Sequence, residues 1–301
     1  MKKLPLIISS VVLVLAMLAL TFAQGEKTIH KEFDAKKNLD ISIVSGDCFI
    51  ESGAADKIIV DIEYFVKPEK AFKPRFTENS NTLKIKEKWS GSSSGRVKWF
   101  ITVPKDIEID FSAASGDLEI DGTSGSIDAS TASGDISIRN TTGDLDISTA
   151  SGDIDGKEIS GELELSTASG DIELDKVKGS FDLSCASGDI DISDAEVENM
   201  SDFSTASGDV EVSLAASPKD DIEISAASGD VALDYNRNKM EGYFEVTVRK
   251  GKGRIKSDVD FDKVEEIERH GRTRIRKSFK AGSSTVNVSL SSASGTATLK
   301  K

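Results

Sequence analysis

Short strands on a fixed repeat dominate the hydrophobic pattern of this chain between residues 111 and 235. Aliphatic residues alternate with acidic or small ones after each glycine, as in the segment that contains Ile172, Glu173 and Leu174. Alternation with a period of two is typical of a strand that buries one face. We therefore expect Ile172 and Leu174 to be buried and Glu173 to be exposed.

Glycines separate these strands at a constant interval of nine residues. A fixed period indicates a stacked array of small units rather than a globular domain with a central pocket. Glycines such as Gly152 and Gly170 should lie at tight turns, with either a positive φ or no room for a Cβ atom. The glycines in register are Gly116, Gly125, Gly134, Gly143, Gly152, Gly161, Gly170, Gly179 and Gly188.

The complete repeat is twice as long, because every second unit ends in a near-constant Ser-Thr-Ala-Ser-Gly-Asp corner. This corner occurs at 130–135, 148–153 and 166–171, whereas the corners between these positions vary. An 18-residue coil then has two strands, one constant corner and one free corner. The sequence predicts an all-β fold, a single-stack β-solenoid with coils about 4.8 Å apart.

The N-terminus has the features of an export signal. Two lysines precede an apolar run from Leu4 to Leu20, and small residues follow it. This pattern predicts a secretory signal peptide that is cleaved after Ala23. The alternative is an uncleaved anchor, because the run is almost long enough to span a bilayer. Either interpretation predicts an exported protein that is secreted, or periplasmic and part of a cell envelope.

Composition divides the chain into four segments. In the last of them we expect a hairpin of strands 243–248 and 254–259, then a short helix at 262–270, then two closing strands. The segments are a signal peptide at 1–23, an N-terminal β region capping the array at 24–110, the Ser-Gly-Asp repeat solenoid at 111–235 and a C-terminal β hairpin with closing strands at 236–301.

Charge is segregated along the chain. Residues 111–235 contain 29 acids and 5 bases, a net charge of −24, whereas residues 236–301 contain 16 bases and 8 acids. The acidic array excludes nucleic acid as its partner, because a phosphate backbone requires basic contacts. Export makes nucleic acid a poor partner for the basic segment too, which we interpret as a solvated hairpin that offsets the array.

Stacking of the coils places one aspartate per constant corner in a column. Unit charges about 5 Å apart repel by roughly 0.8 kcal/mol even in water, so the column needs compensation. Each carboxylate could accept backbone N–H groups of its own turn, or divalent cations could lie between coils. The residues that we name as weak candidates for cation screening are Asp135, Asp153, Asp171 and Asp189.

A dedicated calcium site is not predicted at these aspartates. Calcium-binding nonapeptide repeats have Gly-Gly-x-Gly-x-Asp, whose loop carbonyls complete a shell of 6–8 oxygens. Here the constant corner of each coil has one glycine, with the aspartate directly after it. We therefore predict no metal site and no cofactor, and keep a calcium-stabilised acidic repeat as an alternative.

Catalytic chemistry has little support in the sequence. The two histidines, His30 and His270, lie in the flanks without evident partners. Acid-rich solenoids that cleave polysaccharides use paired carboxylates, usually beside aromatic sugar platforms, and residues 111–230 contain no Trp or Tyr. We predict no catalytic residue and no enzyme, and keep a polysaccharide-cleaving β-helix enzyme as a second alternative.

Hydroxyl and thiol side chains of the repeat allow two interpretations. The Ser and Thr columns of the constant corner could form a regular ligand-binding ladder, but hydrogen-bonded Thr that fixes the register is favoured. Cys48 takes the inward aliphatic position after Ser45-Gly46-Asp47, and Cys185 replaces the threonine of the constant corner. We interpret both as small apolar substitutes that do not form a disulfide.

One family resemblance follows from these motifs. A Val-Pro-Lys-Asp entry at 103–106, the Ala-Ser-Gly-Asp-Leu segment at 114–118 and the later Thr-Ala-Ser-Gly-Asp-Ile units resemble the bacterial putative-adhesin family of β-solenoid domains. The resemblance covers residues 40–300 and implies an exported, non-enzymatic envelope or surface protein.

The function predicted from the sequence is therefore an exported, non-enzymatic β-solenoid that provides a structural or adhesin-like binding surface of the cell envelope. Its partner would be an envelope or surface ligand of unknown identity. Contact with a membrane would occur only through an uncleaved signal anchor.

Overall fold

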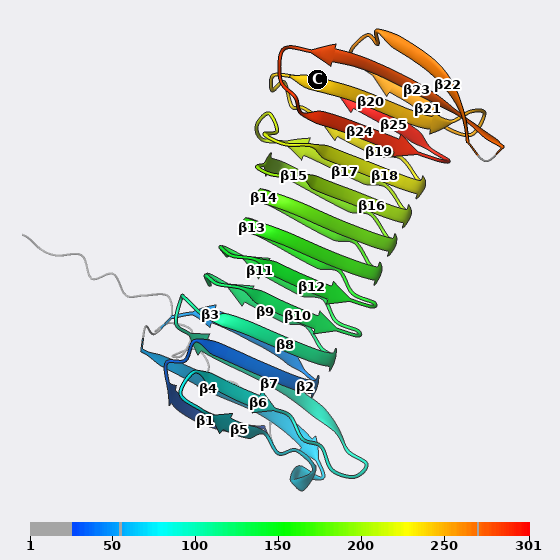
Figure 1. The fold of residues 1–301 in the computed structure, drawn as a ribbon. Helices are drawn as coiled ribbons and strands as arrows, with labels where there is room; N and C mark the ends of the chain where they lie inside the picture. Colours follow the sequence, from blue (N-terminus) through cyan, green and yellow to red (C-terminus); the bar gives the residue numbers. More distant parts are fainter. Residues whose placement is uncertain (1–25, 54–55, 270) are drawn as a thin grey trace, which may run out of the picture.

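The chain winds into an elongated, two-faced β-solenoid whose strands stack along one axis (Figure 1). This computed structural model describes residues 26–53, 56–269 and 271–301. The predicted signal peptide at 1–23 lies outside the described residues. Neighbouring coils pair in parallel with an 18-residue offset, for example Ile127 with Leu145, so the predicted fold class is confirmed.

Face 1 carries the strands that precede the constant corners, and antiparallel strands extend it at both ends. From the N-terminal to the C-terminal end of the stack it contains β5 (Arg75–Glu78), β6 (Thr82–Lys86), β2 (Asn38–Ser45), β8 (Glu108–Ser115), β10 (Ile127–Thr131), β12 (Leu145–Thr149), the second halves of β13 (Ile154–Ser169) and β14 (Ile172–Ser187), β16 (Ser201–Ser207), β18 (Ile222–Ser228), β24 (Asn287–Ser292), β20 (Gly242–Arg249), β23 (Arg272–Ala281) and β22 (Lys263–Arg269).

Face 2 carries the strands that follow the constant corners. In the same direction it contains β1 (Lys27–Asp34), β4 (Lys57–Lys67), β7 (Ser94–Val103), β3 (Asp47–Ser52), β9 (Leu118–Asp121), β11 (Ile136–Arg139), the first halves of β13 and β14, β15 (Ile190–Val197), β17 (Val210–Leu214), β19 (Val231–Asp234), β25 (Thr296–Lys300) and β21 (Arg254–Ser257). A 3-10 helix, η2 (Glu69–Ala71), lies between β4 and β5. The two faces are continuous, because β13 and β14 run unbroken through the free corner.

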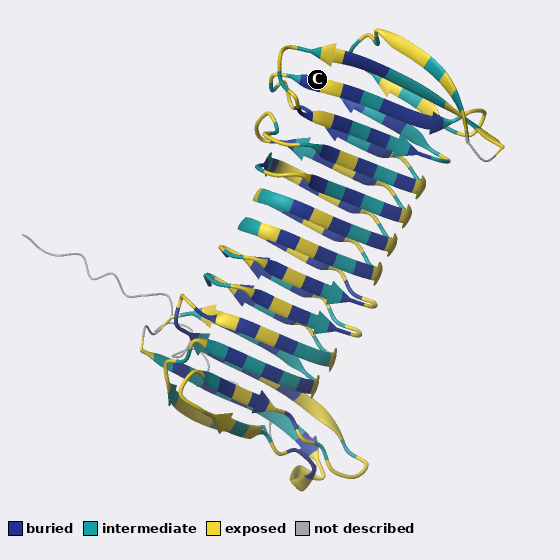
Figure 2. Ribbon diagram, viewed as in Figure 1, coloured by how far each residue is buried: buried dark blue, intermediate teal, exposed yellow. Residues whose placement is uncertain are grey.

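The core lies between the two faces and follows the predicted alternation (Figure 2). Ile172 and Leu174 are 0% and 3% exposed, whereas Glu173 between them points to solvent. Gly156 leaves an inward position without a side chain, and Leu174 packs into that space. The inward and outward assignments made from the sequence are therefore confirmed in this coil.

Glycine at the constant corner is required by the stacking of backbones. A Cβ atom built on Gly152 would lie 2.0 Å from the carbonyl oxygen of Gly134 in the preceding coil, and one on Gly170 would lie 2.0 Å from that of Gly152. Neither glycine is among the residues with positive φ. Of the two predicted reasons for glycine, lack of room for a Cβ is therefore the one that holds here.

The outermost coils are not in sequence order. The coil formed by β24 and β25, at the C-terminus, inserts between the coil of β18 and β19 and the coil of β20 and β21. At the other end, β2 and β3 lie between the coil of β8 and β9 and the outer strands β6 and β7. Both flanking segments thus add coils to the array as well as antiparallel strands.

Two predictions for the C-terminal segment are wrong. Strands β20 and β21 do not form a hairpin, because β20 pairs with β23 and β24 while β21 pairs with β25. The turn between them is another solenoid corner, and Gly253 stacks against Gly295. The predicted helix at 262–270 is strand β22 over Lys263–Arg269, because the segment pairs antiparallel with β23 and tertiary pairing outweighs local preference.

Aromatic side chains close the core at both ends of the stack. Phe72 packs against Trp99 with a ring-centroid distance of 6.2 Å at the N-terminal end. Phe244 stacks on Phe279 with a centroid distance of 4.6 Å at the C-terminal end. Aromatic rings bury large areas per residue, so they suit the ends, where no further coil covers the aliphatic core.

A candidate binding groove along the constant corners

The outer surface of face 1 carries three parallel columns of side chains, which the strand registers align. The acidic column consists of Asp40, Asp110, Asp128, Asp146, Glu164, Asp182, Asp202 and Glu223. The serine column consists of Ser42, Ser112, Ser130, Ser148, Ser166, Ser184, Ser204, Ser225 and Ser291. The alanine column lies two residues after each serine and consists of Ala114, Ala132, Ala150, Ala168, Ala186, Ala206, Ala227 and Ala293.

The small side chains of the serine and alanine columns line a groove along face 1 beside the constant corners. Its volume is about 1180 Å³, and its lining runs from Ala113 in β8 to Ala293 beyond β24. Each coil contributes hydroxyl and methyl groups at the same height, so the surface of the groove repeats about every 4.8 Å. The constant Ser-Thr-Ala corner was the signal for this groove in the sequence. The folded strands show which of its residues face outward: the serine and the alanine do, and the threonine between them faces inward.

Alternation separates the serines of the corner from its threonines. Thr167 and Thr205 point into the core, and their Oγ1 atoms donate hydrogen bonds to the carbonyl oxygens of Gly152 and Gly188 at 3.1 and 3.0 Å. Each bond links one coil to the preceding one. The threonines therefore fix the register, as favoured from the sequence, although they bond to glycine carbonyls and not to each other.

The two cysteines are free and buried. Cys48 is 0% exposed on the inner side of β3, and Cys185 replaces an inward threonine at 5% exposure. Burial raises the pKa of Cys185 to about 12 and also raises that of Cys48. Both thiols are therefore protonated at neutral pH and serve as small core residues, as predicted.

The four aspartates named as candidates for cation screening form a hydrogen-bonded ladder. Oδ1 of Asp135 accepts the backbone N–H of Asp153 at 3.0 Å, and Oδ1 of Asp153 accepts that of Asp171 at 2.9 Å. Asp171 binds Asp189 in the same way at 2.8 Å. The predicted acceptance within each aspartate's own turn is wrong: the parallel stack brings the N–H of the next coil within reach.

This ladder assigns a structural role to one oxygen of each carboxylate. Within residues 26–53, 56–269 and 271–301, no group of three or more His, Cys, Asp or Glu side chains is arranged to hold a metal ion. Screening of the ladder by cations stays a prediction, which thermal melts in calcium and in magnesium would test.

The acidic column borders the groove with charges that have few cationic neighbours. In the described chain, no ion pair joins its members from Asp110 to Glu223 to a basic side chain, whereas Asp40 pairs with Lys84. Desolvation, followed by the neighbouring carboxylates of the column, raises the pKa of Asp128 and of Asp202. This side of the groove therefore repels anions.

The outer surface of face 2 differs in having cations among its acids. Arg139 pairs with Glu119 at 2.8 Å and Lys157 with Asp175 at 3.0 Å. A hollow of about 420 Å³ at this place is lined largely by charged side chains that include Arg139 and Lys157. The two faces thus present different chemistry, with neutral small groups in the groove of face 1 and mixed charge on face 2.

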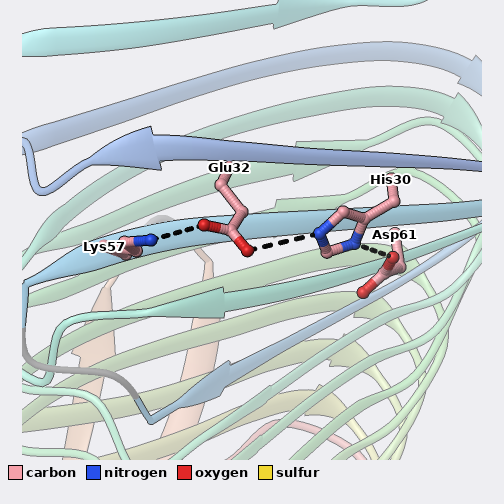
Figure 3. A network of polar contacts seen from close by, with 4 residues as sticks. All are labelled: His30, Glu32, Lys57 and Asp61. Atoms are coloured by element: carbon pink, nitrogen blue, oxygen red, sulfur yellow. Dashed lines mark hydrogen bonds and ion pairs between the residues drawn. The ribbon is translucent and has the colours of Figure 1, made fainter.

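His30 has partners that the sequence did not reveal (Figure 3). Its Nδ1 atom lies 2.7 Å from Asp61 Oδ1, and its Nε2 atom lies 3.5 Å from Glu32 Oε1, which belongs to a carboxylate that also binds Lys57. The hydrogen bond to Asp61 is the main cause that raises the pKa of His30. This exposed network joins β1 to β4 and contributes little free energy. His270 lies outside the described residues.

The groove ends at residues that sequence reasoning missed. Arg274 of β23 and Thr247 of β20 line its C-terminal end together with Ser291 and Ala293. These residues come from segments that only the inserted C-terminal coil brings together. Nothing in the spacing of the sequence indicates that Arg274 continues a surface built by residues 130–227.

Comparison with known proteins identifies the family. The family model described as Toastrack DUF4097 matches residues 36–260, so the chain belongs to the Toastrack family. This match confirms the predicted resemblance to the putative-adhesin β-solenoid domains. None of the curated proteins compared with the chain matches it.

Two solved structures from Parabacteroides distasonis share the fold. One, described as a putative adhesin, has 12% identity and a TM-score of 0.54, and the match covers 91% of this chain and 98% of that one. The other, described as a putative lipid binding protein, has 15% identity and a TM-score of 0.53, with 91% and 97% covered. At this identity the likeness concerns the fold alone. In the described residues, no helix is long and apolar enough to cross a membrane.

Proposed function

We propose that this protein is an exported, non-enzymatic binding scaffold of the cell surface, and that its ligand lies in the groove of face 1. The continuous groove of about 1180 Å³ is the observation that carries the proposal. Membership of the Toastrack family and the description of one structural neighbour as a putative adhesin support it. Export rests on the predicted signal peptide at 1–23.

The chemistry of the groove suits an extended, uncharged and hydroxylated ligand surface. Serine hydroxyls both donate and accept hydrogen bonds, and alanine methyl groups offer apolar contact without projecting into the groove. The acidic column adds hydrogen-bond acceptors along one border. Strands that are hydrogen-bonded on both sides hold these groups at fixed spacing, so little conformational entropy is lost when a ligand binds.

Filling the groove tests this proposal. The double variant Ala168→Gln with Ala186→Gln adds bulk at two exposed positions and leaves the net charge unchanged. We expect it to lose at least about tenfold in the capture of cell-surface fractions and in binding to a glycan array, because large side chains would occupy the ligand's place. Thermal melts should match those of the wild type.

The matched control places the same side chain on the opposite face. Ser137→Gln with Ala232→Gln alters two half-buried positions on the outer surface of face 2 and should leave capture unchanged. Equal loss in both variants, or no loss in either, would contradict the use of the groove. A turnover activity that one carboxylate substitution abolishes would favour the polysaccharide-cleaving alternative. A large shift of the melting temperature in calcium, but not in magnesium, would favour the calcium-stabilised alternative.

A further inference from the structure

The character of the groove changes at its C-terminal end. There the alanine column stops at Ala293. On the next strand, β20, Val248 pairs with Ser292, so Arg249 follows Val248 as Ala293 follows Ser292. The acidic column is interrupted after Glu223 by Ser289 on β24. Its next register position, Glu245 on β20, pairs with Arg276 at 3.0 Å. A surface of small neutral groups with an acidic border thus meets a group of arginines.

Arg249 and Arg274 lie directly opposite each other on the antiparallel strands β20 and β23. Like charges in this position are destabilising unless an anion lies between or above them. Within the described residues, no ion pair involves Arg249, Arg272 or Arg274. By contrast, Arg276 on the same strand pairs with Glu245 at 3.0 Å.

Thr247 provides an independent indication of a ligand. Thr247 pairs with Ser291 of the serine column on one side and with Arg276 on the other, lines the groove and is only 8% exposed. Its Oγ1 atom has no hydrogen-bond partner. An unpaired buried hydroxyl costs free energy, and a ligand oxygen in the groove would remove that cost.

We propose that Thr247, Arg249 and Arg274 form the binding site for an anionic group of a glycan whose neutral sugar units lie along the groove. This inference deepens the proposed function and rests on it. Each arginine can bind a carboxylate or sulfate group with two parallel hydrogen bonds, and Thr247 adds a hydroxyl donor. The acidic column repels anions elsewhere along the groove, so the acidic unit binds at this end and orients the chain.

Binding of matched oligosaccharides tests the site. Isothermal titration compares a neutral oligosaccharide with one of equal length that ends in a uronate. We expect the acidic ligand to bind about tenfold tighter, and this advantage to shrink as salt is raised. Arg274→Gln and Arg249→Gln should each remove the advantage and leave binding of the neutral ligand unchanged.

Two further variants separate a ligand contact from a structural role. Thr247→Val removes an unpaired hydroxyl, so it should weaken the acidic ligand about threefold while the melting temperature stays equal or rises. Lys256→Gln makes the same charge change as Arg274→Gln in the same end of the molecule, but on β21 of face 2. It should leave binding of both ligands unchanged.

Three binding results would overturn the inference: equal affinity for the two oligosaccharides, a loss of acidic-ligand affinity in Lys256→Gln equal to that in Arg274→Gln, or inorganic sulfate binding as tightly as the acidic ligand. A self-association that Arg274→Gln abolishes would also overturn it, because the arginines would then bind a second copy of the chain. If surface fractions are captured in a groove-dependent but Arg274-independent way, the proposed function stands and this site fails. If the groove-filling variant also captures normally, both fail.

Discussion

At the scale of single residues, one backbone carbonyl of the preceding coil determines which side chains the constant corner can contain. In Gly152 the space where a Cβ would lie is taken by the carbonyl oxygen of Gly134, at 2.0 Å. The same oxygen accepts the hydroxyl of Thr149 at 3.5 Å. The glycine at 152 and the hydroxyl donor at 149 are therefore two consequences of the same close stacking of coils.

Gly152→Ala should be among the most damaging single-methyl additions in the chain. The contact is with backbone, which cannot rotate away, so the coils must separate at a cost on the order of 3 kcal/mol. Gly91→Ala is the control: Gly91 has φ of +70° but open space around its Cβ position, which predicts a cost of about 1 kcal/mol. Urea denaturation measures both, and a cost for Gly152→Ala no larger than that for Gly91→Ala would contradict the steric reason for glycine at the corner.

At the scale of elements, parallel stacking in register repeats every side chain at the same height and so concentrates charge. The acidic column of face 1 and the aspartate ladder of the corner have similar composition, but the column destabilises the folded chain whereas the ladder stabilises it. Carboxylates of the ladder accept backbone N–H groups, whereas those of the column lie beside each other. Only the ladder converts repetition into hydrogen bonds between coils.

The acidic column predicts a dependence of stability on pH. Desolvation, and then the carboxylates of Asp146 and Asp110, raises the folded pKa of Asp128 above its ordinary 3.8. The charged form is therefore penalised in the folded chain above the raised pKa, and the penalty disappears as the pH falls toward 3.8. Asp128→Asn with Asp202→Asn should stabilise the protein at pH 7 by about 0.5 kcal/mol, and by almost nothing near pH 4.

Melting temperatures across this pH range measure the effect. Asp135→Asn serves as the control, because the Asp135 carboxylate accepts the N–H of Asp153 at 3.0 Å. It should destabilise the protein at pH 7, the opposite sign for the same chemical change. If both variants were stabilising, general charge reduction would explain the result and the two columns would not differ.

At the scale of the whole molecule, the order of coils in space differs from their order in the chain. The coil of β24 and β25 comes last in sequence but has a neighbouring coil on each side. Chain termini are usually among the least stable parts of a domain. Here the C-terminal residues instead connect the array to the aromatic end that contains Phe244 and Phe279.

Leu299→Ala should therefore cost as much as a substitution in the middle of the array. Leu299 and Leu183 are both 0% exposed, although Leu299 lies two residues from the end of the chain. Loss of either side chain should cost about 2–5 kcal/mol through lost burial and a cavity. Chemical denaturation compares the two, and a cost below about 1 kcal/mol for Leu299→Ala alone would show that the last coil is only loosely attached.

The amino-acid pattern was enough to predict the repeat, the two strands per coil and the direction in which side chains point. These properties are local: glycine spacing and alternation depend on residues within one coil, and identical neighbours reinforce them. The burial of Leu174, the exposure of Glu173 and the need for Gly152 follow from them. The small outward residues of the constant corner, and hence the material of the groove, were also visible in the sequence.

How the flanks join the array and where the groove ends could be seen only in the folded chain. The segment predicted as a helix is strand β22, which pairs with β23, and insertion of the last coil places Ser291 between Ser225 and Thr247. The aspartates bonded to the next coil for a related reason, since the donor lies about 18 residues away in the chain but one strand spacing away in space. Contacts between distant segments leave no periodic pattern in the sequence, so the proposed site of Thr247, Arg249 and Arg274 could not be predicted from it.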